Sequence, residues 1–235
     1  MPKYKMVKRR GGVSIGIPVS RNPGLSKTQA KSVRKIAKKT VMGSAETKTV
    51  GKQTENEQLF HNKALYISNL LATTQGIQDP NDLTSNAARI GDSIRLTNAN
   101  IKFWLSNKSD RPNVMYRLIM FWYDTPLTLT DALCFFTQTN KMLDRPNNEN
   151  ISIVDQKYIF SQNNYAVDAN NHERSHLATL KGNWKGRKIQ YDEGGASPKK
   201  RTLGVCLVCY DSFGTLQSDN VASCAYNYNI NFKDL

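Results

Sequence analysis

The chain has 235 residues, with 33 Lys and Arg against 19 Asp and Glu, and a formal net charge of +14. No segment approaches the roughly 18 consecutive apolar residues that cross a bilayer, so membrane insertion is not expected. The basic first residues are not followed by the apolar stretch of a secretory signal. In a chain that is not secreted, the four Cys are expected to be free thiols rather than a disulfide framework.

The positive charge is concentrated near the start of the chain. Residues 1–52 hold 14 Lys and Arg and a single acid, Glu46, whereas residues 53–235 hold 19 bases and 18 acids. The first segment is also rich in Gly and Pro and poor in large apolar residues, which is typical of a chain without a core of its own. We therefore expect a basic arm over residues 1–52 and one domain over residues 53–235, long enough to bury a single core.

Within the arm, one stretch has the pattern of a helix. Ser26 followed by Gln29 is a capping-box signature, and Gly43 is placed to end the helix, which predicts a helix over about residues 27–42. Basic residues would occupy one side of this helix. The other side would carry small apolar residues, namely Ala30, Val33, Ile36, Ala37 and Val41.

Such an arm has three possible roles. A phosphate backbone would attract it through counterion release, without regard to sequence, because Tyr4 is the only aromatic residue available to stack on bases. A membrane surface would need larger apolar residues than this face offers. The third alternative is a solvated helix. Lys8, Arg9 and Arg10 and the cluster between Arg34 and Lys39 could also form a nuclear-import signal, which is compatible with nucleic-acid binding. The candidate nucleic-acid-binding residues are Lys3, Lys5, Lys8, Arg9, Arg10, Arg21, Lys27, Lys31, Arg34, Lys35, Lys38 and Lys39.

After the arm, short β-rich runs alternate with turn residues, which is typical of an all-β sandwich or barrel. Eight strands are predicted, near residues 63–70, 93–105, 114–123, 153–161, 176–182, 186–191, 203–210 and 223–232. One short helix is predicted over about residues 128–138, with Thr130 as its N-cap. The apolar phase of residues 93–105 slips by one residue at Thr97 and Asn98, which predicts a β-bulge.

Two of these strands are apolar on both faces, over residues 114–124 and 203–210. A sandwich strand needs apolar residues on one face only, so the second face needs another cover. This cover could be a helix or loop of the same chain, or another subunit. By contrast, residues 224–232 alternate strictly between apolar residues and Asn, which indicates one buried and one polar face.

No metal, cofactor or catalytic site is predicted. Cys206 and Cys209, with His172 and His176 upstream, are possible zinc ligands, but positions three apart on a strand point to opposite faces. Carboxylates that could bind calcium are loosely spaced; they are Asp79, Asp82, Asp92, Asp192 and Glu193. His61 stands alone and is expected to be structural. Catalytic and nucleotide-binding signatures are absent, and the basic segments 185–188 and 197–201 either contact nucleic acid or face solvent.

Four motifs in chain order resemble those of small viral coat proteins: GDSIRL (91–96), YRLIMFWYD (116–124), TLTDALCFF (128–136) and VDQKYIF (154–160). The order is a strand, a strand containing Phe-Trp, a short helix and a further strand. It is similar to that of the coat proteins of satellite tobacco necrosis virus and of small circular single-stranded DNA viruses, which also begin with a basic arm.

This resemblance implies a single antiparallel jelly-roll of eight strands with a partly helical basic arm. It also implies about sixty copies in a T=1 icosahedral shell around a single-stranded genome, DNA in preference to RNA. The virion would then be its location, with the host nucleus and an import receptor involved during assembly. The alternative is a cellular nucleic-acid-binding protein with a basic tail on a β-domain. Such a domain would usually be basic itself, whereas residues 53–235 are nearly neutral.

Overall fold

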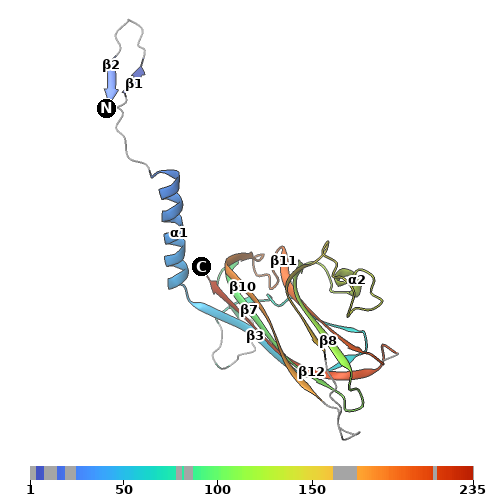
Figure 1. The fold of residues 1–235 in the computed structure, drawn as a ribbon. Coiled ribbons are helices and arrows are strands. Elements are labelled where there is room, and N and C mark those ends of the chain that lie inside the picture. Colours follow the sequence, from blue (N-terminus) through green and yellow to red (C-terminus); the bar gives the residue numbers. More distant parts are fainter. Residues whose placement is uncertain are drawn as a thin grey trace. The chain divides into compact units, whose positions relative to one another are not determined.

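The computed structural model describes residues 4–7, 15–18, 25–77, 81, 87–160, 174–213 and 216–234. The chain divides into two compact units, Met1–Ser44 and Ala45–Leu235. The boundary therefore lies at Ser44 rather than at residue 52, because Thr47–Phe60 already forms a strand of the second unit. The first unit contains an antiparallel pair, β1 (Tyr4–Val7) and β2 (Ile15–Pro18), and the helix α1 (Lys27–Ser44) (Figure 1).

The second unit is a sandwich of two four-stranded antiparallel sheets. The first sheet has the order β10-β7-β12-β3 and the second has the order β4-β11-β8-β9. In chain order, the strands of the sandwich switch from one sheet to the other at every step except between β8 and β9, which pair within one sheet. This is the connectivity of a jelly-roll and confirms the predicted fold. The bounds are β3 Thr47–Phe60, β4 Ala64–Ile67, β7 Ser93–Asn107, β8 Val114–Asp124, β9 Ser152–Phe160, β10 Ser175–Gln190, β11 Arg201–Asp211 and β12 Asn220–Asp234. Outside the sheets are the short parallel pair β5 (Thr74–Gln75) and β6 (Ala87–Arg89) and the helix α2 (Asp131–Cys134).

Eight strands were expected and eight form the sandwich, but they are not the same eight. β3 was not predicted, because only Val50 and Leu59 of its fourteen residues are buried and its sequence lacks alternation. Conversely, residues 176–182 and 186–191 were predicted as two strands, yet they form one strand, β10. It continues past an irregularity between Asn183 and Arg187, where the pairing with β7 shifts register.

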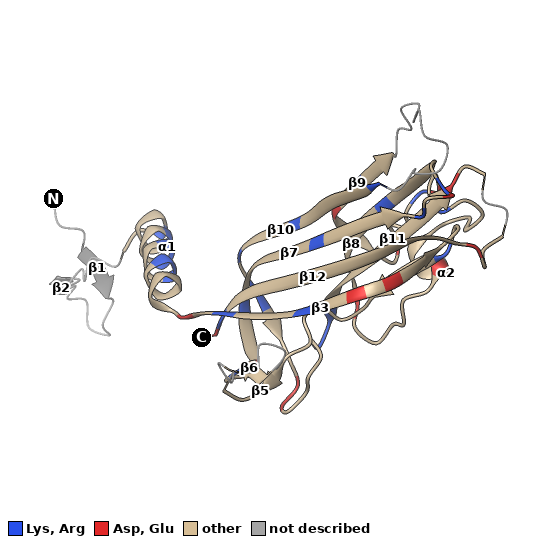
Figure 2. Cartoon of the chain, turned by 90° about the horizontal axis from the view of Figure 1, so that it is seen from below, with Lys and Arg blue, Asp and Glu red and all other residues tan. Residues whose placement is uncertain are grey.

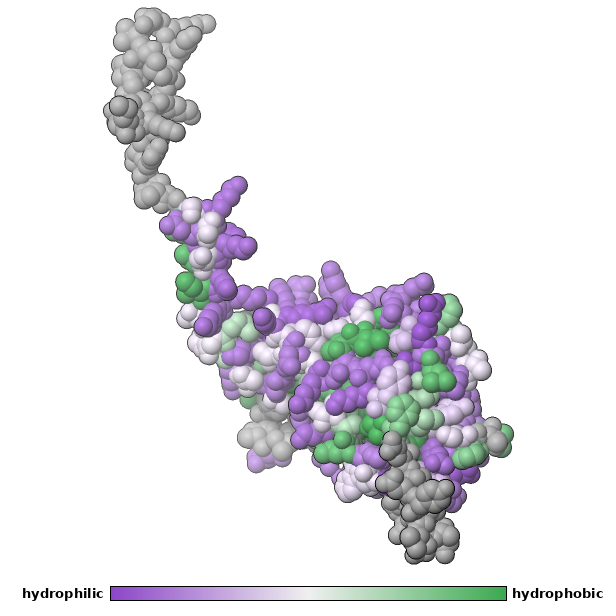
Figure 3. Space-filling model, viewed as in Figure 1, coloured by the Kyte–Doolittle hydropathy of each residue, from purple (hydrophilic) through white to green (hydrophobic). Residues whose placement is uncertain are grey.

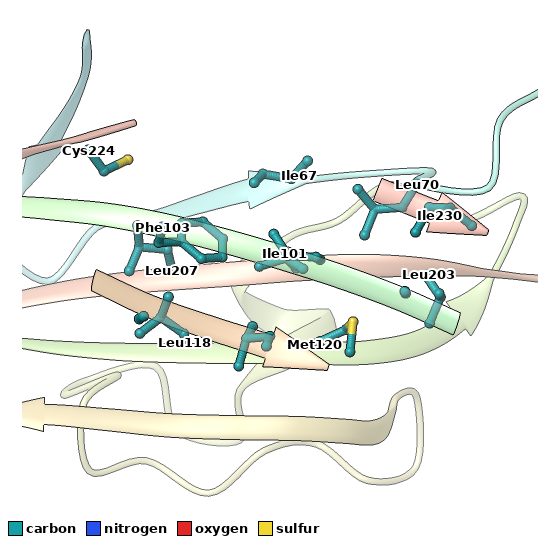
Figure 4. Close-up of a cluster of buried hydrophobic side chains, with 14 of the residues drawn as sticks. Ile67, Leu70, Ile101, Phe103, Leu118, Met120, Leu203, Leu207, Cys224 and Ile230 are labelled. Carbon is teal, nitrogen blue, oxygen red and sulfur yellow. The ribbon is translucent and has the colours of Figure 1, made fainter. Parts of the chain in front are cut away.

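Two apolar clusters are built on β8 and β11, one on each face. Between the sheets, Leu118 and Met120 of β8 and Leu203 and Leu207 of β11 pack with Ile101 and Phe103 of β7 (Figure 4). On the outer face, Ile119, Phe121, Cys206 and Val208 pack with Leu129, Cys134 and Phe135. The last three belong to residues 125–151, which follow β8 and include α2. The second apolar face is therefore covered by the same chain, and these strands give no argument for another subunit.

A buried arginine ties this covering segment to the sheet. Arg117 Nη1 donates hydrogen bonds to the carbonyls of Lys141 (2.7 Å) and Asp144 (2.5 Å), and Arg117 is 1% exposed. Lys141 is also buried, with its Nζ 2.9 Å from Asp131 and donating to the carbonyl of Asn62. Polar groups that are almost completely buried need hydrogen-bond partners. These contacts therefore hold the covering segment in one position on the sheet.

The predicted bulge in β7, the predicted alternation in β12 and the predicted N-cap of α2 are confirmed, but α2 is shorter than expected. Asn231 pairs with Asn98 and Phe232 with Leu96, so Thr97 is the extra residue of a β-bulge. Thr130 caps α2 by accepting a hydrogen bond from the Leu133 amide, but this helix spans only Asp131–Cys134 instead of residues 128–138. Among the described residues, no helix is both long and apolar enough to cross a membrane.

Candidate nucleic-acid interface

The helix α1 begins where its capping box predicts. The Ser26 amide donates to Gln29 Oε1 (2.9 Å) and the Gln29 amide donates to Ser26 Oγ (3.2 Å), so two amides of the first turn are satisfied by side chains. The helix ends at Ser44, so Gly43 lies inside its last turn rather than after it. No residue of α1 is buried, and even Val33, Ile36 and Val41 are each about half exposed or more.

Six predicted binding residues lie on α1, and each is exposed: Lys27, Lys31, Arg34, Lys35, Lys38 and Lys39. Residues 1–44 contain twelve Lys and Arg and no Asp or Glu, so no carboxylate in this unit can neutralise them. In Figure 2, the charged residues of α1 are all basic. Like charges at i,i+4 spacing destabilise a helix, and a helix of this length is marginal alone. A bound polyanion would relieve this repulsion.

The other six predicted residues receive less support. Lys5 lies on β1. Lys3, Lys8, Arg9, Arg10 and Arg21 lie outside the described residues.

The sandwich unit has a different charge pattern. Residues 45–235 hold 21 Lys and Arg and 19 Asp and Glu, which leaves them nearly neutral. Several of these charges pair, among them Lys48 with Asp234 (3.4 Å) and Lys199 with Asp192 (2.9 Å). Figure 3 shows polar and apolar side chains interspersed over one face of this unit. The charge separation seen in the sequence is therefore also a separation between the two units.

The two basic segments of the domain are brought together by the fold. Residues 185–188 lie in the second half of β10 and residues 197–201 lead into β11, and both line one pocket beside Trp122. Sequence reasoning left these segments as either binding or solvated, because nothing in the sequence indicates that they meet across the two sheets.

Those possible metal ligands that the structure describes are not assembled into a site. Cys206 packs in the outer cluster and Cys209 in the inner one, so their thiols lie on opposite faces of β11, as strand alternation predicts. All four Cys are buried free thiols, and among the described residues no group of three possible ligands is close enough to hold a metal ion. His172, Asp79 and Asp82 lie outside the described residues.

The remaining candidates have structural contacts. Asp92 lies 3.2 Å from the buried Arg89, and Asp192 pairs with Lys199. His61 is buried, accepts a hydrogen bond from the Asp211 amide (3.2 Å) and packs on Tyr210. Burial lowers the pKa of His61, so the neutral ring that accepts this bond is favoured.

Comparison of the sequence with models of protein families and with curated proteins gives no match. Comparison of the fold gives similarity to virus structures. One is titled desmodium yellow mottle tymovirus, with 7% identity, a TM-score of 0.33 and coverage of 81% of this chain and 88% of that one. Turnip yellow mosaic virus has 9% identity and a TM-score of 0.35, covering 81% and 82%. Tomato aspermy virus has 8% identity and a TM-score of 0.33, covering 87% and 95%. These likenesses are distant and assign no function to this chain.

Proposed function

We propose that the protein is a structural capsid protein, whose jelly-roll units form an icosahedral shell and whose arm packages a single-stranded genome. The observation that carries this proposal is the division of charge. Twelve bases and no acid lie in residues 1–44, and they precede a nearly neutral jelly-roll. A shell unit must contact copies of itself without strong repulsion, whereas a packaging segment must neutralise phosphate.

The magnitude of the charge fits this division. About sixty arms with about twelve excess charges each would offset on the order of 700 phosphates, which is a useful share of a small genome. The motif order described above favours circular single-stranded DNA as that genome. Lys8, Arg9 and Arg10, with the cluster between Arg34 and Lys39, would also serve as an import signal for assembly in the host nucleus. We assign no catalytic role to the chain.

Support for association comes from apolar side chains that remain exposed after folding. Tyr158 and Phe160 of the edge strand β9 stack on each other and are 44% and 58% exposed. Arg117 lies against Tyr158 and also binds the backbone on both sides of Leu143, which is 79% exposed. A second copy of the chain is the partner that a shell requires, and contact with it would remove these apolar groups from water.

The alternative is a cellular nucleic-acid-binding protein that carries the same arm on a monomeric sandwich. Both proteins would bind nucleic acid, so binding alone does not distinguish them. Assembly does. A capsid protein buries its exposed apolar surface between copies, whereas a monomeric binding protein does not.

The test is sedimentation and electron microscopy of the purified full-length chain. We expect closed particles of uniform size, close to sixty copies, that contain nuclease-resistant nucleic acid. Digestion with deoxyribonuclease or ribonuclease after opening the particles identifies the genome type. A folded protein that stays monomeric at high concentration in moderate salt would favour the alternative.

A further inference from the structure

The sandwich unit contains a small basic pocket at one end. It has a volume of about 180 Å³ and lies where the end of β8 meets the second half of β10 and the start of β11. Its lining includes Trp122, Arg187, Lys188, Pro198, Lys200 and Arg201. Pockets for drug-sized ligands are about 300–1,000 Å³, so this one suits a smaller group.

Arg187 is oriented without using its hydrogen-bond donors. Its guanidinium lies 4.0 Å from the centre of the Trp122 ring. The ring is 4% exposed and is held edge-on by Trp184, with centroids 5.5 Å apart. Cation–π stacking leaves the guanidinium N–H groups available, and no acceptor among the described residues takes them. A guanidinium held in this way can donate two parallel hydrogen bonds to the oxygens of one oxyanion.

Arg201 forms the second fixed cation. Its Nη2 donates to the Trp122 carbonyl (3.0 Å) and to Ser152 Oγ (3.2 Å), and its Nε lies 3.3 Å from Asp124. Asp124 is the carboxylate that offsets this charge. In the described part of the chain, the side chain of Lys200 has no ion pair, so the pocket retains excess positive charge. Burial, and then the neighbouring Arg201, lower the pKa of Arg187, which is the effect expected of an uncompensated cation.

A separate row of positive charge crosses the outer face of the first sheet. Lys188 pairs directly with Arg95, Arg95 pairs with Lys233, and Lys233 pairs with Thr47, the first residue of β3. Directly paired residues share a face of a sheet, and like charges in such positions destabilise it. Their neighbours in sequence, Ile94, Leu96, Ile189 and Phe232, are buried between the sheets, so these three cations form a row on the outer face of the first sheet. Arg187 lies on the inner face, against Trp122.

We propose that this pocket binds a phosphate group of a single-stranded nucleic acid, as a second contact made by the shell domain itself. Arg187 would bind the phosphate oxygens through its guanidinium, with Arg201 and Lys200 supplying further charge. The pocket is too small for a whole nucleotide, and Arg187 covers Trp122, so bases are not read there. The inference rests on the proposed function, because it names where the packaged strand leaves the arm and meets the shell.

The test is acetylation of lysines in the full-length protein, quantified by mass spectrometry with and without a single-stranded oligonucleotide at low salt. We expect acetylation of Lys200 to fall about threefold or more. Lys63 and Lys108 are matched controls. Both are exposed, and they follow the far ends of β3 and β7, so their acetylation should not change. In Arg187→Gln, protection of Lys200 should be largely lost while protection on α1 remains.

Each of the other outcomes would contradict a stated part of the proposal. Protection of Lys31, Lys35 and Lys38 without protection of Lys200 would overturn the pocket and leave the proposed function standing. Protection of neither set would overturn both. Equal protection by the same concentration of inorganic phosphate would mean a site for the free ion rather than for a strand. If Lys200 stayed fully protected in Arg187→Gln, the proposed role of the Arg187 guanidinium would be wrong.

Discussion

Arg117 shows how one residue decides what covers a sheet. Its guanidinium lies on the outer face of β8 between the rings of Phe135 (5.6 Å) and Tyr158 (5.2 Å). It donates to backbone carbonyls of the segment over residues 125–151. Burial lowers the pKa of Arg117, yet the hydrogen bonds satisfy carbonyls that water cannot reach. In the sequence, Arg117 is only a polar interruption of an apolar strand.

We expect Arg117→Met to destabilise the domain by about 2–3 kcal/mol, since each buried carbonyl left without a donor costs about 1–3 kcal/mol. Removing the buried charge recovers part of that cost. Urea unfolding measures the loss, and limited proteolysis within residues 125–151 shows where the structure loosens. Arg145→Met is the matched control, because Arg145 is exposed over Phe136, and it should cost less than about 1 kcal/mol. Equal losses in the two variants would contradict this account.

At the scale of elements, α1 is a helix with a single kind of charge. Its capping box defines where it begins, while no carboxylate in residues 1–44 opposes its six bases. Its role as a binding element is testable apart from its stability, because Gln retains helix propensity close to that of Lys and Arg.

Replacing Lys31, Arg34, Lys35 and Lys38 with Gln should lower the salt dependence of binding. In a plot of log K against log salt, the slope should decrease by up to about four for duplex DNA, and by less for single strands. Fluorescence anisotropy at several salt concentrations measures this slope. The matched control is Gln at Lys63, Lys102, Lys108 and Lys157, four exposed domain lysines without a carboxylate partner in the described structure. An unchanged slope in the α1 variant would mean that the stripe is a solvated face.

At the scale of the whole molecule, the two units divide the work that we propose. Every strand of the two main sheets lies at or after Thr47, and among the described residues none of the arm belongs to the apolar clusters. Folding of the sandwich should therefore not require residues 1–44, whereas neutralisation of a genome should.

Removing residues 1–42 should give a domain that folds and still associates, but that no longer retains nucleic acid. Circular dichroism measures folding, sedimentation measures association, and the ratio of absorbance at 260 and 280 nm measures nucleic acid. The full-length protein prepared in parallel is the control. An unfolded truncation product would show that the arm belongs to the fold, and particles that still carry a full complement of nucleic acid would show that the arm is not the packaging element.

Local features were predictable from the sequence because their causes are local. The capping box needs two residues three apart, the bulge at Thr97 is visible as a change of phase, and the alternation along residues 224–232 follows from strand geometry. The charge division is a matter of composition. These observations were enough to predict an all-β domain behind a basic arm with a helix in it.

What only the tertiary structure decided depends on contacts between distant residues. β3 is a strand because β12 pairs with it along nearly its whole length, not because its own sequence alternates. The cover over Ile119 and Phe121 comes from residues 125–151, which the sequence could not distinguish from another subunit. The pocket beside Trp122 exists because the two sheets place Arg187 and Arg201 at the same end. Pairing and packing across the sandwich determine these features, and their energy lies in contacts that no single segment contains.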